Sequence, residues 1–186
     1  MRQVAPLKID LGCGTRKKAG FIGVDVRAFP GVDLVIDLTA RWPWENDSVE
    51  EVHCSHFLEH LDAAERIHFV NELYRILKTG ARATIITPHW ASARAYGDLT
   101  HKWPPVSEFW YHYLLKSWRD TEAPHNDFYT CNFQTEFNYS LSRMHEGASA
   151  SQRSFALANF KDAADDLWAM LVKLPAAAGD QSPTGR

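Results

Sequence analysis

Residues 7–14 read LKIDLGCG, a short apolar run that ends in two glycines separated by one residue. The run predicts a buried strand from Leu7 to Leu11. Gly12 and Gly14 allow a sharp turn and a close approach of the backbone to a ligand. Lys17 stands where the dinucleotide-binding fingerprint has its third glycine, and the Gly-Lys-Ser/Thr sequence of a phosphate-binding loop is absent. A tight turn without a ligand therefore stays an alternative for this motif alone.

Further strands follow the first at short intervals. FIGVDV predicts a strand ending at Asp25, VDLVIDL one ending at Asp37, SVEEVHCS one ending near Ser55, and RATIITP one stopped by Pro88. A helical apolar period over residues 62–77 predicts a helix, with an aspartate as its N-cap. This succession predicts an open, doubly wound α/β sheet, and such sheets bind ligands at the carboxyl ends of their strands.

The first two connections between these strands are unusually short. Only residues 15–20 and 26–31 are available, whereas a parallel crossover that contains a helix needs a dozen residues or more. Both crossovers should be abbreviated, which leaves one face of the sheet without its usual cover. The aromatic segment 106–118, through Phe109, Trp110 and Tyr113, or a second subunit in a homodimer could cover that face; an ordinary core helix is the alternative for the segment.

The chain changes in texture after Pro88. Residues 89–130 are rich in Trp, Tyr, His and Pro, and we interpret them as an insertion on the acceptor side of one domain spanning 1–174. Within the rest of that domain we expect a strand over 131–141, a helix over 152–164 and a last strand over 166–174. The small and polar residues 175–186 predict a disordered tail.

Composition excludes several classes of protein. The 186 residues are 45% hydrophobic and carry a formal net charge of -3, which is ordinary for a globular domain and gives no strong nucleic-acid signature. Cys13, Cys54 and Cys131 are odd in number and far apart, which argues against a disulfide framework and fits a reducing cytoplasm. The sequence shows no signal peptide and no run long enough to span a membrane.

Acidic residues end the second and third predicted strands. Asp25 can accept two hydrogen bonds from ribose hydroxyls, and Asp37 can accept one from an adenine amine. A solvated aspartate is as good an interpretation for either residue alone. Both residues follow strands at the edge that the glycine turn also occupies, which favours a nucleoside ligand.

The stretch SHFLEH, residues 55–60, contains the pattern H-x-x-E-H. On a helix, His56 and His60 would lie one turn apart and could hold zinc, with Glu59 activating a water molecule. A zinc hydrolase is therefore an alternative function, although no third ligand is evident in the sequence. A packed or hydrogen-bonded histidine at a helix start is the simpler interpretation of His60, and we expect no metal.

Several stretches together resemble the class I S-adenosylmethionine-dependent methyltransferases, in the small branch called methyltransferase type 11. The stretches cover roughly residues 7–105 and occur in the family's order: IDLGCG, GVD, DLTARWPWENDSVEEVHCSHFLEHL, ELYRILKTGARATIITP and GDLTHK. The resemblance implies a mostly parallel Rossmann-like sheet whose last strand runs antiparallel. It also implies S-adenosyl-L-methionine as the cofactor and methyl transfer as the activity.

The resemblance also implies which residues bind the cofactor. Asp10, Gly12, Cys13 and Gly14 would line its methionine part, and Asp25 would hold the ribose diol. The residues expected at the adenine and around the rest of the pocket are Asp37, Leu38, Ser55, His56 and Phe57. The abbreviated crossovers leave this pocket less walled than in longer methyltransferases.

The acceptor should bind after the fifth strand, at the same edge of the sheet. PHWASARAYGDLTHKW brings His89, Tyr96, Asp98 and His101 into one loop, and GDLTHK resembles the family's DPTHK-type loop, with Leu99 in place of the usual proline. We expect His101 to orient the acceptor or act as its base, helped by Asp98, with His89 next. Hydrogen bonds that merely fix the loop are the alternative.

The sequence leaves the acceptor unidentified. We expect a small-molecule or sugar-type acceptor. The second alternative function is a cofactor-binding module of the same fold that has lost turnover, because fold alone does not prove chemistry.

Overall fold

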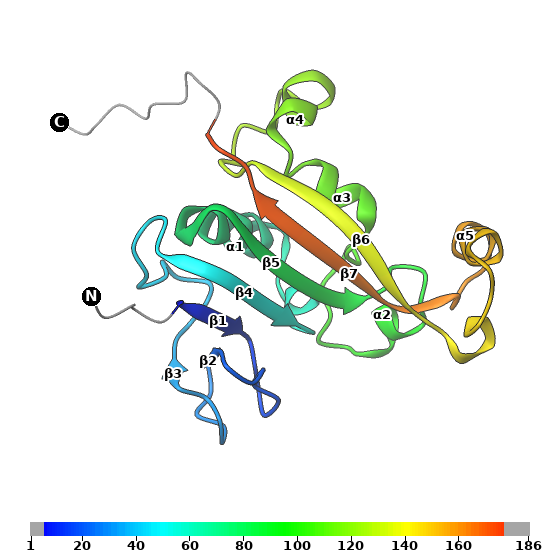
Figure 1. Cartoon of the computed structure of the whole chain (residues 1–186), viewed down its shortest axis with the longest axis horizontal. Helices are drawn as coiled ribbons and strands as arrows, with labels where there is room; N and C mark the ends of the chain where they lie inside the picture. Colours follow the sequence, from blue (N-terminus) through cyan, green and yellow to red (C-terminus); the bar gives the residue numbers. More distant parts are fainter. Residues whose placement is uncertain (1–5, 177–186) are drawn as a thin grey trace.

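The computed structural model describes residues 6–176, and its strands form a single seven-stranded sheet (Figure 1). The order across the sheet is β3-β2-β1-β4-β5-β7-β6. The strands are β1 Lys8–Leu11, β2 Ile22–Asp25, β3 Leu34–Val35, β4 Val49–Ser55, β5 Leu77–Pro88, β6 Phe133–Leu141 and β7 Ala164–Lys173. The helices are η1 Leu58–His60, α1 Ala63–Ile76, α2 Arg94–Gly97, α3 Glu108–His112, α4 Lys116–Glu122, η2 Arg143–His145 and α5 Ala150–Asn159.

The strand directions confirm the predicted fold class. Strands β1 to β5 pair in parallel, whereas β7 is antiparallel to both of its neighbours, β5 and β6. The carboxyl ends of β1, β2, β4 and β5 therefore share one edge of the sheet. The glycine turn, Asp25, Ser55 and the segment after Pro88 all begin at that edge.

Helix α1 is the one helical crossover among the first five strands. Its N-cap is the predicted Asp62, whose side chain accepts from the Glu65 N–H while the Glu65 side chain accepts from the Asp62 N–H. This capping box satisfies backbone donors that the helix itself cannot. The chain then passes directly from α1 into β5, so Gly80 lies inside that strand, with φ of 80°.

The abbreviated first crossovers are confirmed, and a third connection, residues 36–48, also lacks a helix. In place of a helix, side chains of this connection pack against α1. Trp42 is 2% exposed and packs edge-on against Phe69 of α1, with ring centroids 5.3 Å apart. Glu72 accepts from the Trp42 N–H at 2.8 Å, and Arg75 donates to the Trp42 and Trp44 carbonyls. Two side chains of α1 thus supply the partners that a helix would have supplied within itself.

One face of the sheet is left partly open. Along β7, Leu167, Ala169 and Leu171 are buried, whereas Trp168 and Met170 on the other face are each 39% exposed. Because side chains alternate along a strand, the exposed pair marks the face that the missing crossover helices would cover. On the neighbouring strands, this face carries the ion pair of Lys8 with Glu51.

The aromatic segment 106–118 does not cover the open face. Tyr111 of α3 is 2% exposed and packs against Phe137 of β6, on the face where Tyr74 of α1 also packs against β6. Phe109 is 62% exposed. The alternative of an ordinary core helix is therefore correct for α3, because its inward side chains fill the side already covered by α1.

Other predicted boundaries shift with packing. Strand β3 has only two residues, and both are exposed, so it lacks the burial that its apolar sequence suggested. Helix α5 ends at Asn159, well before Ala164, which instead begins β7. Helix α4 was not predicted as a separate element. Most of the predicted disordered tail, residues 177–186, lies outside the described residues.

Membrane insertion finds no support in the helices. None of those within residues 6–176 combines the length and the apolar character that crossing a bilayer requires.

We expect Arg75→Ala to lower the free energy of unfolding by about 2–4 kcal/mol in urea denaturation. The change removes five hydrogen bonds and leaves the buried Glu72 carboxylate without its ion-pair partner. Arg153→Ala, at an exposed position of α5, should change stability by less than about 0.5 kcal/mol. Equal losses in both variants would contradict the role of Arg75.

The contribution of Glu72 should also depend on pH. Burial alone would raise the pKa of Glu72, but hydrogen bonds from Arg75 and the Trp42 N–H outweigh it and hold that pKa below 4.5. The stabilisation is complete above pH 4.5, the ordinary value for the unfolded chain, and is lost as the pH falls through the lower folded pKa. The stability difference between wild type and Arg75→Ala should therefore shrink in acid.

Candidate active site at the carboxyl edge of the sheet

The glycine turn after β1 has the backbone conformation that its sequence predicts. Gly12 and Gly14 have φ of 67° and 51°, which side chains rarely adopt. A Cβ on Gly12 would lie 2.5 Å from the ring of Phe57, so the ring packs directly on this glycine. A Cβ on Gly14 would meet nothing within 4 Å. The turn is thus closed by Phe57 at Gly12 and open at Gly14.

Asp25 links the end of β2 to this turn. Its Oδ2 accepts from the Gly14 N–H at 2.9 Å, and its Oδ1 accepts from the Arg27 N–H at 3.0 Å. A carboxylate oxygen can accept more than one hydrogen bond, so both oxygens keep acceptor capacity for a ligand. The carboxylate lies next to the open side of Gly14, where a ligand diol could reach it.

The Asp10 carboxylate contacts other groups of the protein through both of its oxygens. It is 2% exposed, accepts from the Lys18 N–H at 2.7 Å and lies 2.7 Å from Nδ1 of His53. Asp10 therefore fastens the short 15–20 connection onto β1 and β4. Burial, followed by the nearby Asp10 and Asp25 charges, raises the pKa of the Cys13 thiol, so this cysteine stays a neutral thiol.

The third predicted strand end holds Asp37 in a tight local turn. Its Oδ1 accepts from the N–H and the hydroxyl of Thr39, and the hydroxyl and N–H bonds hold the Asp37 pKa below its usual range. Oδ2 accepts from none of the described residues. The Leu38 carbonyl accepts from Trp42 Nε1, and its side chain is buried in the core.

The SHFLEH stretch is not one α-helix. Ser55 ends β4, His56 has a positive φ of 54°, and only Leu58–His60 form a 3₁₀ turn. His56 and His60 are therefore not one helical turn apart on a common face. The zinc hydrolase alternative rested on that spacing, and it finds no support.

His56 instead joins an ionic network with the last strand. Its Nδ1 lies 3.3 Å from Glu59 and its Nε2 lies 3.8 Å from Asp166, which also pairs with Arg94 at 2.8 Å. Contact with Glu59 raises the His56 pKa against the opposing effect of burial. Burial raises the pKa of Asp166, while Arg94 and His56 oppose that rise. The network ties the ends of β4 and β5 to β7.

The 98–101 loop lies against the 3₁₀ turn. Asp98 accepts from the N–H and the hydroxyl of Thr100, and His101 places Nδ1 3.1 Å from the Ala95 carbonyl. Because a carbonyl only accepts, Nδ1 carries the proton and Nε2 keeps its lone pair. Nε2 lies 4.0 Å from Asp98, and the ring contacts His60 with centroids 4.9 Å apart.

His89 is separated from this group by its own partners. It is 3% exposed, its Nε2 lies 3.1 Å from Glu108, and its Nδ1 accepts from the Ala91 N–H at 3.3 Å. Glu108 also interacts with Tyr139, and burial followed by the Glu108 charge raises the pKa of Tyr139 to about 12. Both nitrogens of His89 are engaged, so His101 is the better placed of the two histidines to act on a ligand.

An aromatic cavity of about 470 Å³ opens between the segment after β5 and helix α5. Trp90, Tyr96 and Phe160 line it, and the Lys161 ammonium lies 5.6 Å from the Tyr96 ring. Asp162 accepts from the Ala93 N–H and thereby holds the two segments together. The sequence pointed to Tyr96 but not to Phe160, because only the folded chain brings α5 to this loop.

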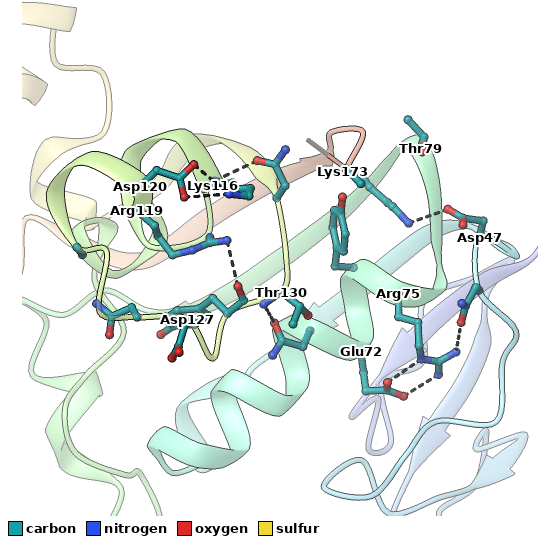
Figure 2. Close-up of a pocket in the computed structure, with 18 of the residues that line it drawn as sticks. Asp47, Glu72, Arg75, Thr79, Lys116, Arg119, Asp120, Asp127, Thr130 and Lys173 are labelled. Atoms are coloured by element: carbon teal, nitrogen blue, oxygen red, sulfur yellow. Dashed lines mark hydrogen bonds and ion pairs between the residues drawn. The ribbon is translucent and has the colours of Figure 1, made fainter. Parts of the chain in front are cut away.

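A larger cavity of about 800 Å³ lies elsewhere, around the start of β5 and the end of β7 (Figure 2). No residue predicted for the site lines it. Its cations already have partners within the protein: Lys173 pairs with Asp47 and Lys116 with Asp120, and Arg119 donates to backbone carbonyls. Chemistry therefore places the candidate site at the carboxyl edge and not in the larger cavity.

Glu59, Asp166 and Arg94 also lie at this edge, where the sequence gave Glu59 a role only in the zinc alternative and gave the other two none. Glu59 carried a signal, because it is a charged residue inside the apolar stretch FLEHL. Asp166 carried none, since its position opposite Pro88 depends on the pairing of β5 with β7.

Comparison with known proteins gives matches among solved structures only; no family model and no curated protein matches this chain. A SAM-dependent methyltransferase from Archaeoglobus fulgidus has a TM-score of 0.63 and 17% identity, over 91% of this chain and 87% of that one. A putative methyltransferase in complex with the Haloferax volcanii Trm112 methyltransferase activator has a TM-score of 0.56 and 18% identity, over 91% and 82%. The cyclase SpnF has a TM-score of 0.53 and 15% identity, over 91% and 76%. At these identities the matches show the fold: this chain has the Rossmann-like fold of SAM-dependent methyltransferases.

We expect Gly12→Ala to lower the free energy of unfolding by about 2–4 kcal/mol, because it adds a clash with Phe57 to a left-handed backbone. Gly14→Ala has the backbone cost without the clash and should lose about 1–2 kcal/mol. Thermal and urea unfolding would measure both.

A double-mutant cycle isolates the clash. Phe57→Ala introduced together with Gly12→Ala should cost less than the sum of the single losses. Additive losses would show that Phe57 does not constrain Gly12.

Proposed function

We propose that the chain transfers a methyl group from S-adenosyl-L-methionine to a small-molecule or sugar-type acceptor. The observation that carries the proposal is the hydrogen bond that the Asp25 carboxylate accepts from the Gly14 N–H. It places an acceptor-rich carboxylate beside an open glycine turn, at the edge where sheets of this fold bind ligands. The methyltransferase fold supports the same assignment.

The residues fit this cofactor at its nucleoside end. Asp25 would accept from the two ribose hydroxyls, and Oδ2 of Asp37 would accept from the adenine amine. The methionine part would lie along Gly14, because Phe57 fills the space over Gly12. Asp10 and Cys13 would support this turn from behind. Ser55 and His56 would close the pocket after β4.

The cofactor would supply an electrophilic methyl group on a positively charged sulfur, and the protein would align the acceptor and exclude water. The aromatic cavity beside Trp90 and Tyr96 suits the acceptor, since flat apolar rings pack against the faces of sugars and aromatic molecules alike. One wall of this cavity comes from the 89–130 insertion, which we assign to the acceptor side, and the other comes from the end of α5 and the residues after it.

His101 would orient the acceptor or take a proton from it. Its Nε2 has a free lone pair, and the nearby Asp98 would stabilise the imidazolium that forms. Hydrogen bonds from the Thr100 N–H and hydroxyl hold the pKa of Asp98 below its usual range, so Asp98 stays ionised. His89, engaged at both ring nitrogens, would position the loop.

A cofactor-binding module without turnover is the second candidate. The Phe57 ring over Gly12 favours it, because it narrows the space for the methionine part. Formation of S-adenosylhomocysteine in the presence of acceptors separates the two candidates. An active transferase produces S-adenosylhomocysteine, whereas a silent module binds S-adenosylmethionine and produces none.

The cysteine thiols and the open face of the sheet bear on the cellular compartment and on a partner subunit. Cys13, Cys54 and Cys131 are buried free thiols, which suits the reducing cytoplasm. A second copy of the chain that covers Trp168 and Met170 would complete the open face of the sheet. Light scattering would report such a homodimer.

We expect Asp25→Ala to weaken S-adenosylmethionine binding at least roughly tenfold in calorimetric titration, through the loss of charge-assisted hydrogen bonds. Asp120→Ala is the control, because Asp120 pairs with Lys116 on α4, away from the glycine turn. Unchanged affinity in Asp25→Ala would remove this residue from the site. Binding of NADH in place of S-adenosylmethionine would overturn the proposed function.

We expect His101→Gln and His101→Ala to lower turnover by roughly a hundredfold, with little change in cofactor affinity. His112→Ala, at an exposed position of α3, is the matched control. Normal turnover in both His101 variants would mean that no base acts here. A parallel loss of cofactor affinity would instead assign His101 a structural role.

A further inference from the structure

Glu59 presents an unresolved electrostatic problem. It is 4% exposed, and neither carboxylate oxygen has a hydrogen-bond partner among the described residues. A buried carboxylate without donors is costly, and such groups are normally paired or coordinate a metal. Glu59, His60 and His101 each offer one possible ligand atom, and these three atoms all lie within 4.8 Å of one another.

The neighbouring cations do not resolve the problem. Arg66 contributes positive charge nearby, but its three nitrogens donate to the carbonyls of Leu58, Pro104 and Lys102. His56 forms an ion pair with Oε1 of Glu59 at 3.3 Å but makes no hydrogen bond to it, and Oε2 has neither kind of partner among the described residues. The buried Tyr111 hydroxyl likewise donates to no described residue.

Hydrogen bonds prepare both imidazoles as ligands. The Thr100 hydroxyl gives its proton to Asp98, so at 2.9 Å it must accept from Nδ1–H of His60. The Ala95 carbonyl accepts from Nδ1–H of His101. Each ring, when neutral, therefore keeps a bare Nε2, and a metal bound to Nε2 of His101 would replace the proton-accepting role proposed for that nitrogen. Metal-binding histidines almost always donate the N–H of their second ring nitrogen to a carbonyl, carboxylate or water. His60 is linked to a carboxylate through Thr100, whose hydroxyl accepts from His60 and donates to Asp98.

We propose that Glu59, His60 and His101 form a binding site for one divalent transition-metal ion of the Zn²⁺ type. Two imidazoles and one carboxylate are a set that binds zinc with a coordination position left open. Bound ligand atoms would lie about 3.3 Å apart in tetrahedral geometry, so atoms that now lie within 4.8 Å of one another would move closer on binding. This set differs from the H-x-x-E-H pair, because His56 is not a ligand and Glu59 is one.

The test uses metal alone, so it does not depend on methyl transfer. Protein stripped with a chelator is titrated with ZnCl₂ by calorimetry, and Co²⁺ is used to record visible absorption bands. We expect one ion per chain, and Glu59→Gln, His60→Ala and His101→Ala should each weaken Zn²⁺ affinity by roughly a hundredfold or more. Thr100→Val should weaken it by roughly ten- to a hundredfold, because it removes the relay to His60.

Two controls keep the outcome decisive. His125→Ala removes an exposed histidine, and His56→Ala removes the one that contacts Glu59 without being a ligand. Both should bind Zn²⁺ with wild-type stoichiometry, and circular dichroism would confirm that every variant folds. No binding by wild type, or equal affinity in folded Glu59→Gln, His101→Ala and His125→Ala, would overturn the proposal. Loss of binding in His56→Ala alone would also overturn it.

Discussion

Backbone groups in the three helix-free connections need hydrogen-bond partners, and side-chain carboxylates supply many of them. Asp10 accepts from Lys18 N–H, Asp25 from Arg27 N–H, and Glu72 from Trp42 N–H. A crossover helix would satisfy such donors internally, so each carboxylate substitutes for part of a missing helix. The sheet keeps its parallel order with little helical cover because these contacts hold the connections against the strands.

The same constraint complicates the assignment of site residues. An aspartate at a strand end can bind a ligand or hold a connection, and sequence alone does not separate the two uses. Asp10 is committed to the second use by its burial and its two partners. Asp25 could serve both, because its bonds to Gly14 and Arg27 shape the turn and still leave acceptor capacity. In the function proposed above, the cofactor pocket and the folded connection would share atoms, and a change at Asp25 would affect both.

The sequence predicted the elements whose signals are local. β1, β2, β4, the Asp62 cap of α1 and the antiparallel last strand all lie where a local pattern or the resemblance placed them. The third helix-free connection was missed, because residues 36–48 are long enough to hold a helix and only Trp42 with Glu72 shows why they do not. The pairing of His56 with Asp166 was also missed, since it depends on strand register.

The histidine-rich stretch shows how folding can redistribute a motif. Read as a helix, H-x-x-E-H puts two histidines on one face with the glutamate beside them. The left-handed backbone of His56 breaks that spacing, turning its ring toward β7 while Glu59 and His60 face the 98–101 loop. His101 then supplies the imidazole that the motif loses. A metal bound by Glu59, His60 and His101 is chemically compatible with a methyl donor at the glycine turn. A Lewis acid would lower the pKa of an acceptor hydroxyl, and the methyl group would come from the donor.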